Sequence, residues 1–195
     1  MRSRKSTEVR KEEIIRAALF LVEKNGLDKL NIIDIAKEVK LVPAAIYRHF
    51  KGKEDIVLAL IDFVCSNLQM NLRQVSDYEG TTILKLKKLF ELHVKLLKEE
   101  PAIPRILYFL LSSERNVELK FRMVSEVKNY VQQIKKILIQ GQEKGEISTK
   151  VDAAAAAMLF IGMVQPLGIL GQIEPQVLEE YPSYLWQCYQ RAIDL

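Results

Sequence analysis

The chain contains few residues that interrupt helices and few that perform catalysis or bind metals. Its 195 residues include six prolines, eight glycines, two cysteines and two histidines. Runs of alternating β-branched and aromatic residues, which would indicate strands, are also missing. Hydrophobic residues instead recur at spacings of three and four along almost the whole chain. We therefore expect an all-α fold of about nine helices.

The scarcity of cysteine and histidine excludes several kinds of site. Cys65 and Cys188 lie far apart in amphipathic segments, and we expect both to be buried, reduced thiols rather than metal ligands. His49 and His93 alone cannot complete a nucleophile–base pair or a metal cluster, and no glycine-rich phosphate loop is present. We expect no enzymatic activity, no metal and no cofactor. Because no export signal is visible, we expect a cytoplasmic protein.

Residues 31–54 predict two short helices joined by a tight turn. Asn31 suits the N-cap of the first helix, and Pro43 suits the first position of the second, which would span about seven residues. The inward side chains of the second helix would be Ala45, Ile46 and Phe50. Its outer face would be small, basic and aromatic, and consists of Pro43, Ala44, Tyr47, Arg48 and His49. A short helix with such a face is typical of a helix-turn-helix whose second helix enters a DNA major groove.

Three stretches of this segment, IAKE at 35–38, AIYRHF at 45–50 and KED at 53–55, carry a resemblance to a known family. They resemble the N-terminal DNA-binding region of TetR/AcrR-type transcriptional regulators. Beyond these 24 residues the resemblance rests on length and helix order. The family usually has Gly where this chain has Lys40, and a Lys in the left-handed conformation costs roughly 1 kcal/mol relative to Gly. Val42 stands where the family has Ser or Thr, which removes an N-cap and a phosphate contact.

The resemblance implies a repressor that binds a double-stranded DNA operator as a homodimer and is released when a small effector binds its C-terminal domain. Arg48 and the small edge of the second helix would face bases, because Arg is the usual partner of guanine. Tyr47, His49 and Lys53 would hold phosphates. The residues that we expect at the DNA are Asn31, Pro43, Ala44, Ala45, Tyr47, Arg48, His49 and Lys53.

The net charge of +4 is unevenly distributed. Residues 1–53 carry 13 Lys and Arg against 7 Asp and Glu, whereas residues 54–195 carry 16 against 18. A solvated charged surface could produce the same totals. Together with the helix-turn-helix, they favour a DNA-binding domain over 1–53 and a helical effector-binding and dimerisation domain over 54–195. Arg2, Arg4 and Lys5 would form a mobile arm that could reach the DNA backbone.

Periodicity and capping residues predict the remaining helices. They would span residues 8–25, 53–71, 83–98, 105–112, 116–144, 153–170 and 174–193. Asn116 and Asp152 would cap two of them, and Pro101 and Pro104 would flank a break. Residues 153–170 are the only candidate membrane span, but Gln165 and the alanine-rich first turns favour close packing against other helices, so we expect no membrane contact.

The helical body would enclose a mostly apolar effector pocket. Its candidate residues are Leu89, Phe90, His93, Leu97, Ile106, Phe109, Leu110, Phe121, Tyr130, Met158, Ile161 and Gln165. The polar members, His93, Tyr130 and Gln165, would orient a small apolar or aromatic effector. For every one of these residues, a place in the ordinary core is the alternative.

In the family, the eighth and ninth helices pair with their copies in the dimer. The corresponding candidates here are Ala153, Ala157, Ile161, Trp186, Tyr189 and Ile193. The alternative is that both helices simply close the core of the monomer. For the whole chain, the alternative function is an architectural or activating DNA-binding protein that has no small-molecule effector.

Overall fold

The computed structural model describes residues 6–112 and 117–194, and this part of the chain forms ten helices and no strand. The all-α prediction is therefore confirmed. The expected N-terminal arm and the expected Asn116 cap lie outside the described residues. The helices are α1 (Thr7–Asn25), α2 (Ile32–Glu38), α3 (Pro43–Ile46), α4 (Lys53–Ser76), α5 (Thr82–Glu99), α6 (Ala102–Ser112), α7 (Val117–Glu143), α8 (Ala153–Leu170), α9 (Val177–Glu180) and α10 (Pro182–Ile193).

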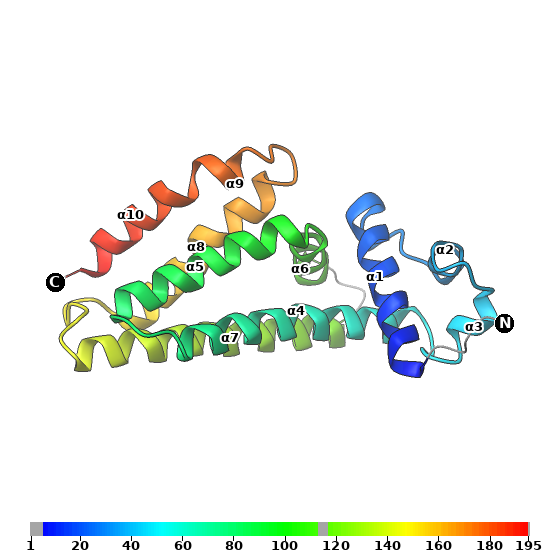
Figure 1. Ribbon diagram of the computed structural model, residues 1–195, viewed down its shortest axis with the longest axis horizontal. Helices are drawn as coiled ribbons and strands as arrows, with labels where there is room; N and C mark the ends of the chain where they lie inside the picture. The colour runs from blue at the N-terminus through cyan, green and yellow to red at the C-terminus, as the bar shows by residue number, and fades with distance from the viewer. Residues whose placement is uncertain (1–5, 113–116, 195) are drawn as a thin grey trace.

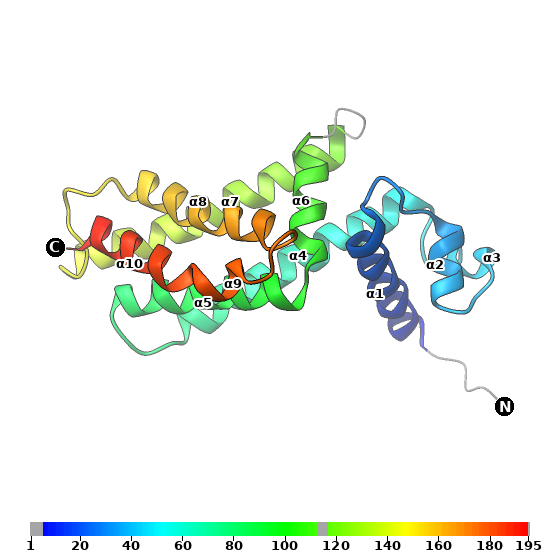
Figure 2. The ribbon, with the colours of Figure 1, turned by 90° about the horizontal axis from the view of Figure 1, so that it is seen from above.

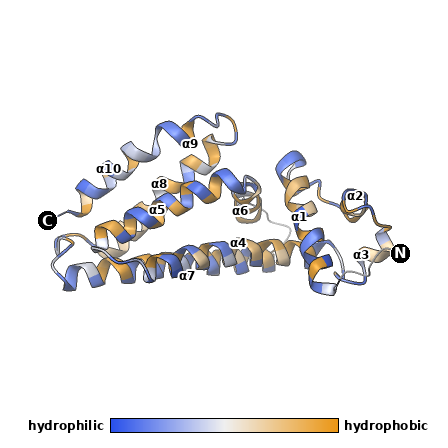
Figure 3. Ribbon diagram, in the orientation of Figure 1, coloured by the Kyte–Doolittle hydropathy of each residue, from blue (hydrophilic) through white to orange (hydrophobic). Residues whose placement is uncertain are grey.

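The molecule is elongated. Helices α1–α3 form one end, which we call the head, and the last turn of α10 lies at the opposite end (Figure 1). Helix α4 leaves the head and runs lengthwise through the remaining helices, the body, where it packs against α5 and α7 (Figure 2). Hydrophilic and hydrophobic residues alternate along α4, α5 and α7 (Figure 3), so each helix has an apolar side to bury.

Side-chain caps fix several helix starts, as the sequence predicts. The side-chain carbonyl of Asn31 accepts a hydrogen bond from Asp34 N at 2.9 Å, and the Asp152 carboxylate accepts one from Ala155 N at 2.7 Å. At the other end of α1, Gly26 adopts a φ of 87°, a left-handed conformation that glycine tolerates without strain. The predicted N-caps at Asn31 and Asp152 and the predicted stop after Asn25 are confirmed.

Three boundaries differ from the prediction, for physical reasons. Helix α4 continues to Ser76 rather than ending at residue 71. Helix α6 begins at Ala102, so Pro104 lies in its first turn, where the missing N–H costs no intrahelical hydrogen bond. The expected helix over 174–193 is divided into α9 and α10, because Pro182 starts a new helix after Tyr181. This division makes the number of described helices ten.

Two hydrophobic clusters form the core. The first combines α1–α3, the first half of α4, α6 and the start of α7. The second combines the end of α4 and α5 with α7, α8, α9 and α10. Helix α6 therefore shares a core with the head, although it follows the head by about fifty residues in the chain. An aromatic group in the second cluster surrounds Phe160, whose ring centroid lies 5.9 Å from that of His93 and 5.5 Å from that of Tyr189.

Two expectations about single segments are wrong. Cys188 is exposed on α10 rather than buried, and Cys65 is half-buried on α4, where burial raises the pKa of its thiol to about 11.

Helix α4, as well as α8, is long and apolar enough to cross a membrane by length and composition, so residues 153–170 are not the only candidate in the described chain. Both helices bury residues against neighbouring helices of the body, as core helices of globular proteins also do.

Candidate DNA-binding surface and effector cavity

The turn between α2 and α3 has the hydrogen bonds of a Schellman motif. Leu41 N donates to Ala36 O at 2.8 Å, and Lys40 N donates to Lys37 O at 3.0 Å. Lys40 occupies the left-handed position with a φ of 57°, and it is the one non-glycine residue with positive φ in the described chain. The motif sets the angle between α2 and α3. It requires the left-handed conformation at Lys40, which is sterically strained for a residue other than glycine.

Helix α3 is shorter than expected, because only Pro43–Ile46 is helical and a turn continues to His49. Ile46 is fully buried and Phe50 is 5% exposed, so these two side chains fix the segment to the head. Val42 provides no side-chain cap, which agrees with the missing Ser or Thr. A helix of this length is stable only through such tertiary contacts.

The outer face of this segment has no partner within the described chain. Pro43, Ala44, Tyr47 and Arg48 are exposed, whereas Ala45 and His49 are half-buried. Sequence reasoning did not assign Val42 to this face, yet its side chain is 66% exposed. The result is a small, apolar edge beside one guanidinium, a shape and chemistry that suit the edges of bases in a major groove.

Lys53 begins α4, three residues after Phe50. Its Nζ donates to Asp28 O in the loop between α1 and α2 at 3.1 Å, which joins the start of α4 to the rest of the head. An ammonium has three donors, so the side chain, which is exposed, can also contact an anion. Asn31, the N-cap of α2, is exposed as well.

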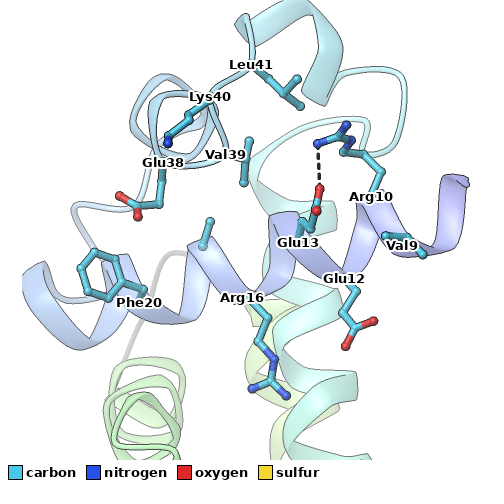
Figure 4. A pocket seen from close by; sticks show the side chains of 11 residues that line it. Val9, Arg10, Glu12, Glu13, Arg16, Phe20, Glu38, Val39, Lys40 and Leu41 are labelled. Atoms are coloured by element: carbon cyan, nitrogen blue, oxygen red, sulfur yellow. Dashed lines mark hydrogen bonds and ion pairs between the residues drawn. The ribbon is translucent and has the colours of Figure 1, made fainter. Parts of the chain in front are cut away.

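A wide groove lies on the head between α1 and the end of α2 (Figure 4). Its volume is about 740 Å³, and its walls include charged side chains such as Arg10, Glu12 and Glu38. Arg10 Nη1 lies 2.7 Å from Glu13 Oε2 across one turn of α1. An open groove with charged walls does not exclude water from an apolar ligand, so it is a poor effector site.

The body contains a smaller and almost wholly apolar cavity of about 110 Å³. Five helices, α4 to α8, contribute residues to its wall, and no single helix forms most of it. The lining residues are Val64, Cys65, Leu68, His93, Leu96, Leu97, Ile103, Pro104, Leu107, Tyr108, Leu111, Met123, Glu126, Val127, Tyr130, Ile161, Val164, Gln165 and Gly168.

Two buried polar side chains interrupt this apolar lining. His93 is 5% exposed, and its Nδ1 lies 2.9 Å from Leu89 O on the same helix. Burial lowers the pKa of His93 to about 4, so the ring is neutral at pH 7. Tyr130 is 3% exposed, its pKa is raised by burial, and its ring centroid lies 5.3 Å from that of His93.

The structure brings five of the candidate pocket residues together at the cavity: His93, Leu97, Tyr130, Ile161 and Gln165. Four others are buried in the core but do not line the cavity: Leu89, Phe90, Ile106 and Leu110. Phe109 is half-buried against the first cluster. Phe121 and Met158 lie outside, 68% and 62% exposed, because their helices turn these positions toward solvent. Fourteen of the nineteen described lining residues were not predicted, Cys65 and Tyr108 among them, because the pattern of one helix does not show where five helices meet.

Helix α6 connects this cavity to the head. Its residues Ile103, Leu107 and Tyr108 line the cavity, while Ile106 and Leu110 pack in the same cluster as α1. Arg16 on α1 reinforces the junction. Its guanidinium forms an ion pair with Glu100 before α6 and lies 4.9 Å from the ring centroid of Phe63 on α4. A displacement of α6 would therefore reach α1 directly.

The end of α8 is fixed to the start of α6. The Gln172 carbonyl accepts from Arg105 Nε at 2.7 Å, and its amide donates to Pro101 O at 3.0 Å. Gly168 permits the approach, because a Cβ at this position would lie only 3.2 Å from Pro104 and 3.3 Å from Leu97. Direct contacts therefore hold the end of α8 and the start of α6 together at the cavity wall.

Four of the six candidate dimer residues are buried within the monomer. Ala157, Trp186, Tyr189 and Ile193 are at most 5% exposed, and Tyr189 Oη donates to Ala156 O at 3.1 Å. The alternative interpretation, that these side chains close the monomer's core, holds for them. Ala153 and Ile161 are half-buried. The outer side of α8 to α10 nevertheless exposes large apolar residues: Leu159, Ile169, Leu170, Ile173, Tyr181 and Tyr184.

Comparison with known proteins agrees with this architecture. The chain is 26% identical over 157 residues to the nucleoid occlusion factor SlmA of Vibrio cholerae serotype O1, covering 80% of each chain. It is 26% identical over 152 residues to the fatty acid metabolism regulator protein of Bacillus subtilis, covering 78% of each. Its fold is similar to the crystal structure of the transcriptional regulator FadR from Bacillus subtilis in complex with stearoyl-CoA, with a TM-score of 0.78, 23% identity and coverage of 91% and 96%.

Family models match both parts of the chain. The model of bacterial regulatory proteins of the tetR family matches residues 14–60, which cover most of the head and the start of α4. The model of the C-terminal region of YsiA-like proteins matches residues 66–168, which include all the residues that line the cavity except Val64 and Cys65. Since the two matches together span most of the sequence, the chain belongs to the TetR family of bacterial transcriptional regulators.

Proposed function

We propose that this protein is a transcriptional repressor that is released from its operator when a fatty acyl-CoA binds in the body. The observation that carries the proposal is the apolar cavity whose wall, α6, shares a hydrophobic core with the head. Two similarities support the choice of effector: a relative is named a fatty acid metabolism regulator, and a protein of similar fold was crystallised with stearoyl-CoA.

The head would read the operator. Arg48 and the exposed edge formed by Val42, Pro43 and Ala44 would face bases, where one bidentate Arg–guanine contact contributes about 1–3 kcal/mol of discrimination. Tyr47 would contact the phosphate backbone. His49 and Lys53 would have the same role. We infer a cytoplasmic regulator without catalytic activity, because the family to which the chain belongs consists of bacterial regulatory proteins.

Release would follow from the size of the cavity. Its volume of about 110 Å³ is below the roughly 300–1,000 Å³ of sites that hold drug-sized ligands. An acyl chain must therefore widen it by displacing a wall. Helix α6, like α4, is a wall that also contacts α1, so the conformation that accommodates the chain differs from the one that fits the operator. Binding of effector and operator are then linked and oppose each other.

We further propose a homodimer. Operators with two half-sites require two recognition helices about 34 Å apart or a multiple of that spacing. The exposed apolar side of α8 to α10 offers a surface for a second copy, and Leu159, Ile173 and Tyr184 are 51%, 75% and 66% exposed on it. Sedimentation as a monomer at micromolar concentration would contradict this proposal.

The alternative is a DNA-binding protein without an effector. The similarity to a nucleoid occlusion factor is as high in identity as the similarity to the fatty acid regulator. The cavity favours the effector-responsive function, because a protein without a ligand gains nothing from leaving His93 and Tyr130 beside unfilled apolar space.

Operator release tests the proposal. Duplexes selected by the protein from a random-sequence pool are labelled, and their binding is followed by fluorescence anisotropy during titration with stearoyl-CoA. We expect the affinity for DNA to fall at least about tenfold, a coupling of about 1.4 kcal/mol, and coenzyme A alone to have no effect. Arg48→Ala should lose DNA discrimination but still bind stearoyl-CoA. An affinity for DNA that does not change at saturating stearoyl-CoA would overturn the proposal.

A further inference from the structure

The Tyr130 hydroxyl has no hydrogen-bond partner among the described residues, although its buried side chain belongs to the cavity wall. A buried hydroxyl without a partner loses its hydrogen bonds with water and gains none in return, and native proteins rarely leave one in this state. No hydrogen bond joins it to His93, in spite of the short distance between the rings. A ligand in the cavity is the natural source of the missing partner.

His93 presents a complementary group. A backbone carbonyl only accepts hydrogen bonds, so the 2.9 Å contact with Leu89 O requires the proton of the neutral ring to be on Nδ1. Nε2 is then an acceptor with a free lone pair. The two side chains together offer the cavity one O–H donor and one nitrogen acceptor, both uncharged.

The described part of the cavity wall carries no positive charge. Among the described residues that line the cavity there is no Lys or Arg, and the single charged one is Glu126, whose side chain is 25% exposed. Glu126 Oε1 lies 3.1 Å from Arg122 Nε, and Arg122 also contacts Asp62, so this cation is already paired with two carboxylates. A carboxylate brought into the cavity would lose its hydration without meeting a free cation, which is strongly unfavourable.

We infer that Tyr130 and His93 select the effector by a neutral oxygen, the carbonyl of an acyl thioester or a hydroxyl on the chain, and that the cavity rejects a free fatty acid. This inference rests on the proposed function and specifies the form in which the acyl group is recognised. The Tyr130 hydroxyl donates a hydrogen bond to the oxygen, and His93 Nε2 accepts a hydrogen bond from it when the oxygen is a hydroxyl. Any charged part of the effector remains outside the cavity.

Two probes with eight-carbon acyl chains test the inference by calorimetry on the full chain at pH 7.5: S-ethyl octanethioate, a neutral thioester, and ionised octanoate. We expect the wild-type protein to bind the thioester at least about tenfold more tightly than octanoate. Tyr130→Phe should weaken thioester binding about 3- to 10-fold, as expected for one lost hydrogen bond, and leave octanoate binding unchanged. Tyr78→Phe is the matched control, because Tyr78 lies in the loop between α4 and α5, outside the cavity, and is 38% exposed, so its loss of a hydroxyl should change neither affinity.

A measurement without ligand separates a ligand-binding role from a structural one. Removing a hydroxyl that has no partner should leave the urea midpoint of the ligand-free protein unchanged or raise it, whereas removing a structural hydrogen bond would lower it. A lowered midpoint in Tyr130→Phe, or octanoate binding as tight as that of the thioester, would overturn this inference and leave operator release by stearoyl-CoA intact. Absence of binding by both probes and by stearoyl-CoA would overturn the inference and the proposed function together.

Discussion

The recognition surface of the head and the cavity of the body are built in opposite ways. The head surface comes from one stretch of residues 42–53, its proposed contact residues are largely exposed, and buried Ile46 and Phe50 hold it in place. The cavity comes from five helices, and two of its polar residues, His93 and Tyr130, are buried within the packed body. The contact residues of the head surface can therefore be substituted without loss of the fold. In the cavity, the side chains that would contact an effector also stabilise the folded protein.

The largest expected effect is on stability, at the aromatic centre of the body. Phe160 is fully buried against Phe90, His93 and Tyr189. Phe160→Ala should lower the free energy of unfolding by about 3–5 kcal/mol, because it removes buried area and leaves a cavity. Tyr47→Ala, on the 56% exposed side chain of the head, should change it by less than about 0.5 kcal/mol while weakening DNA binding. Urea unfolding at 25 °C measures both changes. Equal losses of unfolding free energy in the two variants would contradict the difference between the head surface and the body.

A smaller effect should appear as pH falls. The pKa of His93 is about 4 in the folded protein and 6.5 in an unperturbed side chain. Between these values the unfolded chain binds a proton that the native protein does not, so stability is retained above pH 6.5 and lost as pH falls toward 4. Between pH 7.5 and pH 5 the loss from this residue should be about 2 kcal/mol. His93→Gln should show correspondingly less acid destabilisation in urea titrations at the two pH values, and an identical loss in both proteins would refute the assignment.

The smallest effect concerns the turn of the head. Lys40→Gly should raise the free energy of unfolding by about 1 kcal/mol, because glycine adopts the left-handed φ of 57° without steric strain. Lys37→Gly, three residues earlier and inside α2, should lower it by about the same amount. Thermal or urea unfolding measures both changes. A destabilised Lys40→Gly protein would show that the lysine side chain has a stabilising role that the strain conceals.

The same contrast explains how far the sequence could predict the structure. Helix starts and the recognition face depend on neighbours in the chain, such as the Asn31 cap and Pro43 at the first position of α3, so local pattern was sufficient. The cavity depends on how each of five helices is rotated about its own axis. Periodicity identified the apolar positions of each helix, but it did not show which residues of the other helices those positions contact. Phe121 and Met158 were therefore assigned to a pocket although both face solvent.

The final helices show the same limit. Trp186 and Tyr189 were expected at a dimer interface because large aromatic residues often anchor such surfaces. Their contacts with Phe90 and Phe160 within the monomer depend on how α10 crosses α5 and α8, which no local signal contains. The break at Pro182 was readable in the sequence, since proline often begins a helix.

The central claim is that effector and operator exclude each other, and native mass spectrometry of the purified protein mixed with a selected duplex and stearoyl-CoA tests it most directly. The account predicts two populations, a dimer bound to DNA and a dimer bound to stearoyl-CoA, with the ternary complex far below the abundance that independent binding would give. A ternary complex at the abundance of independent binding would contradict it.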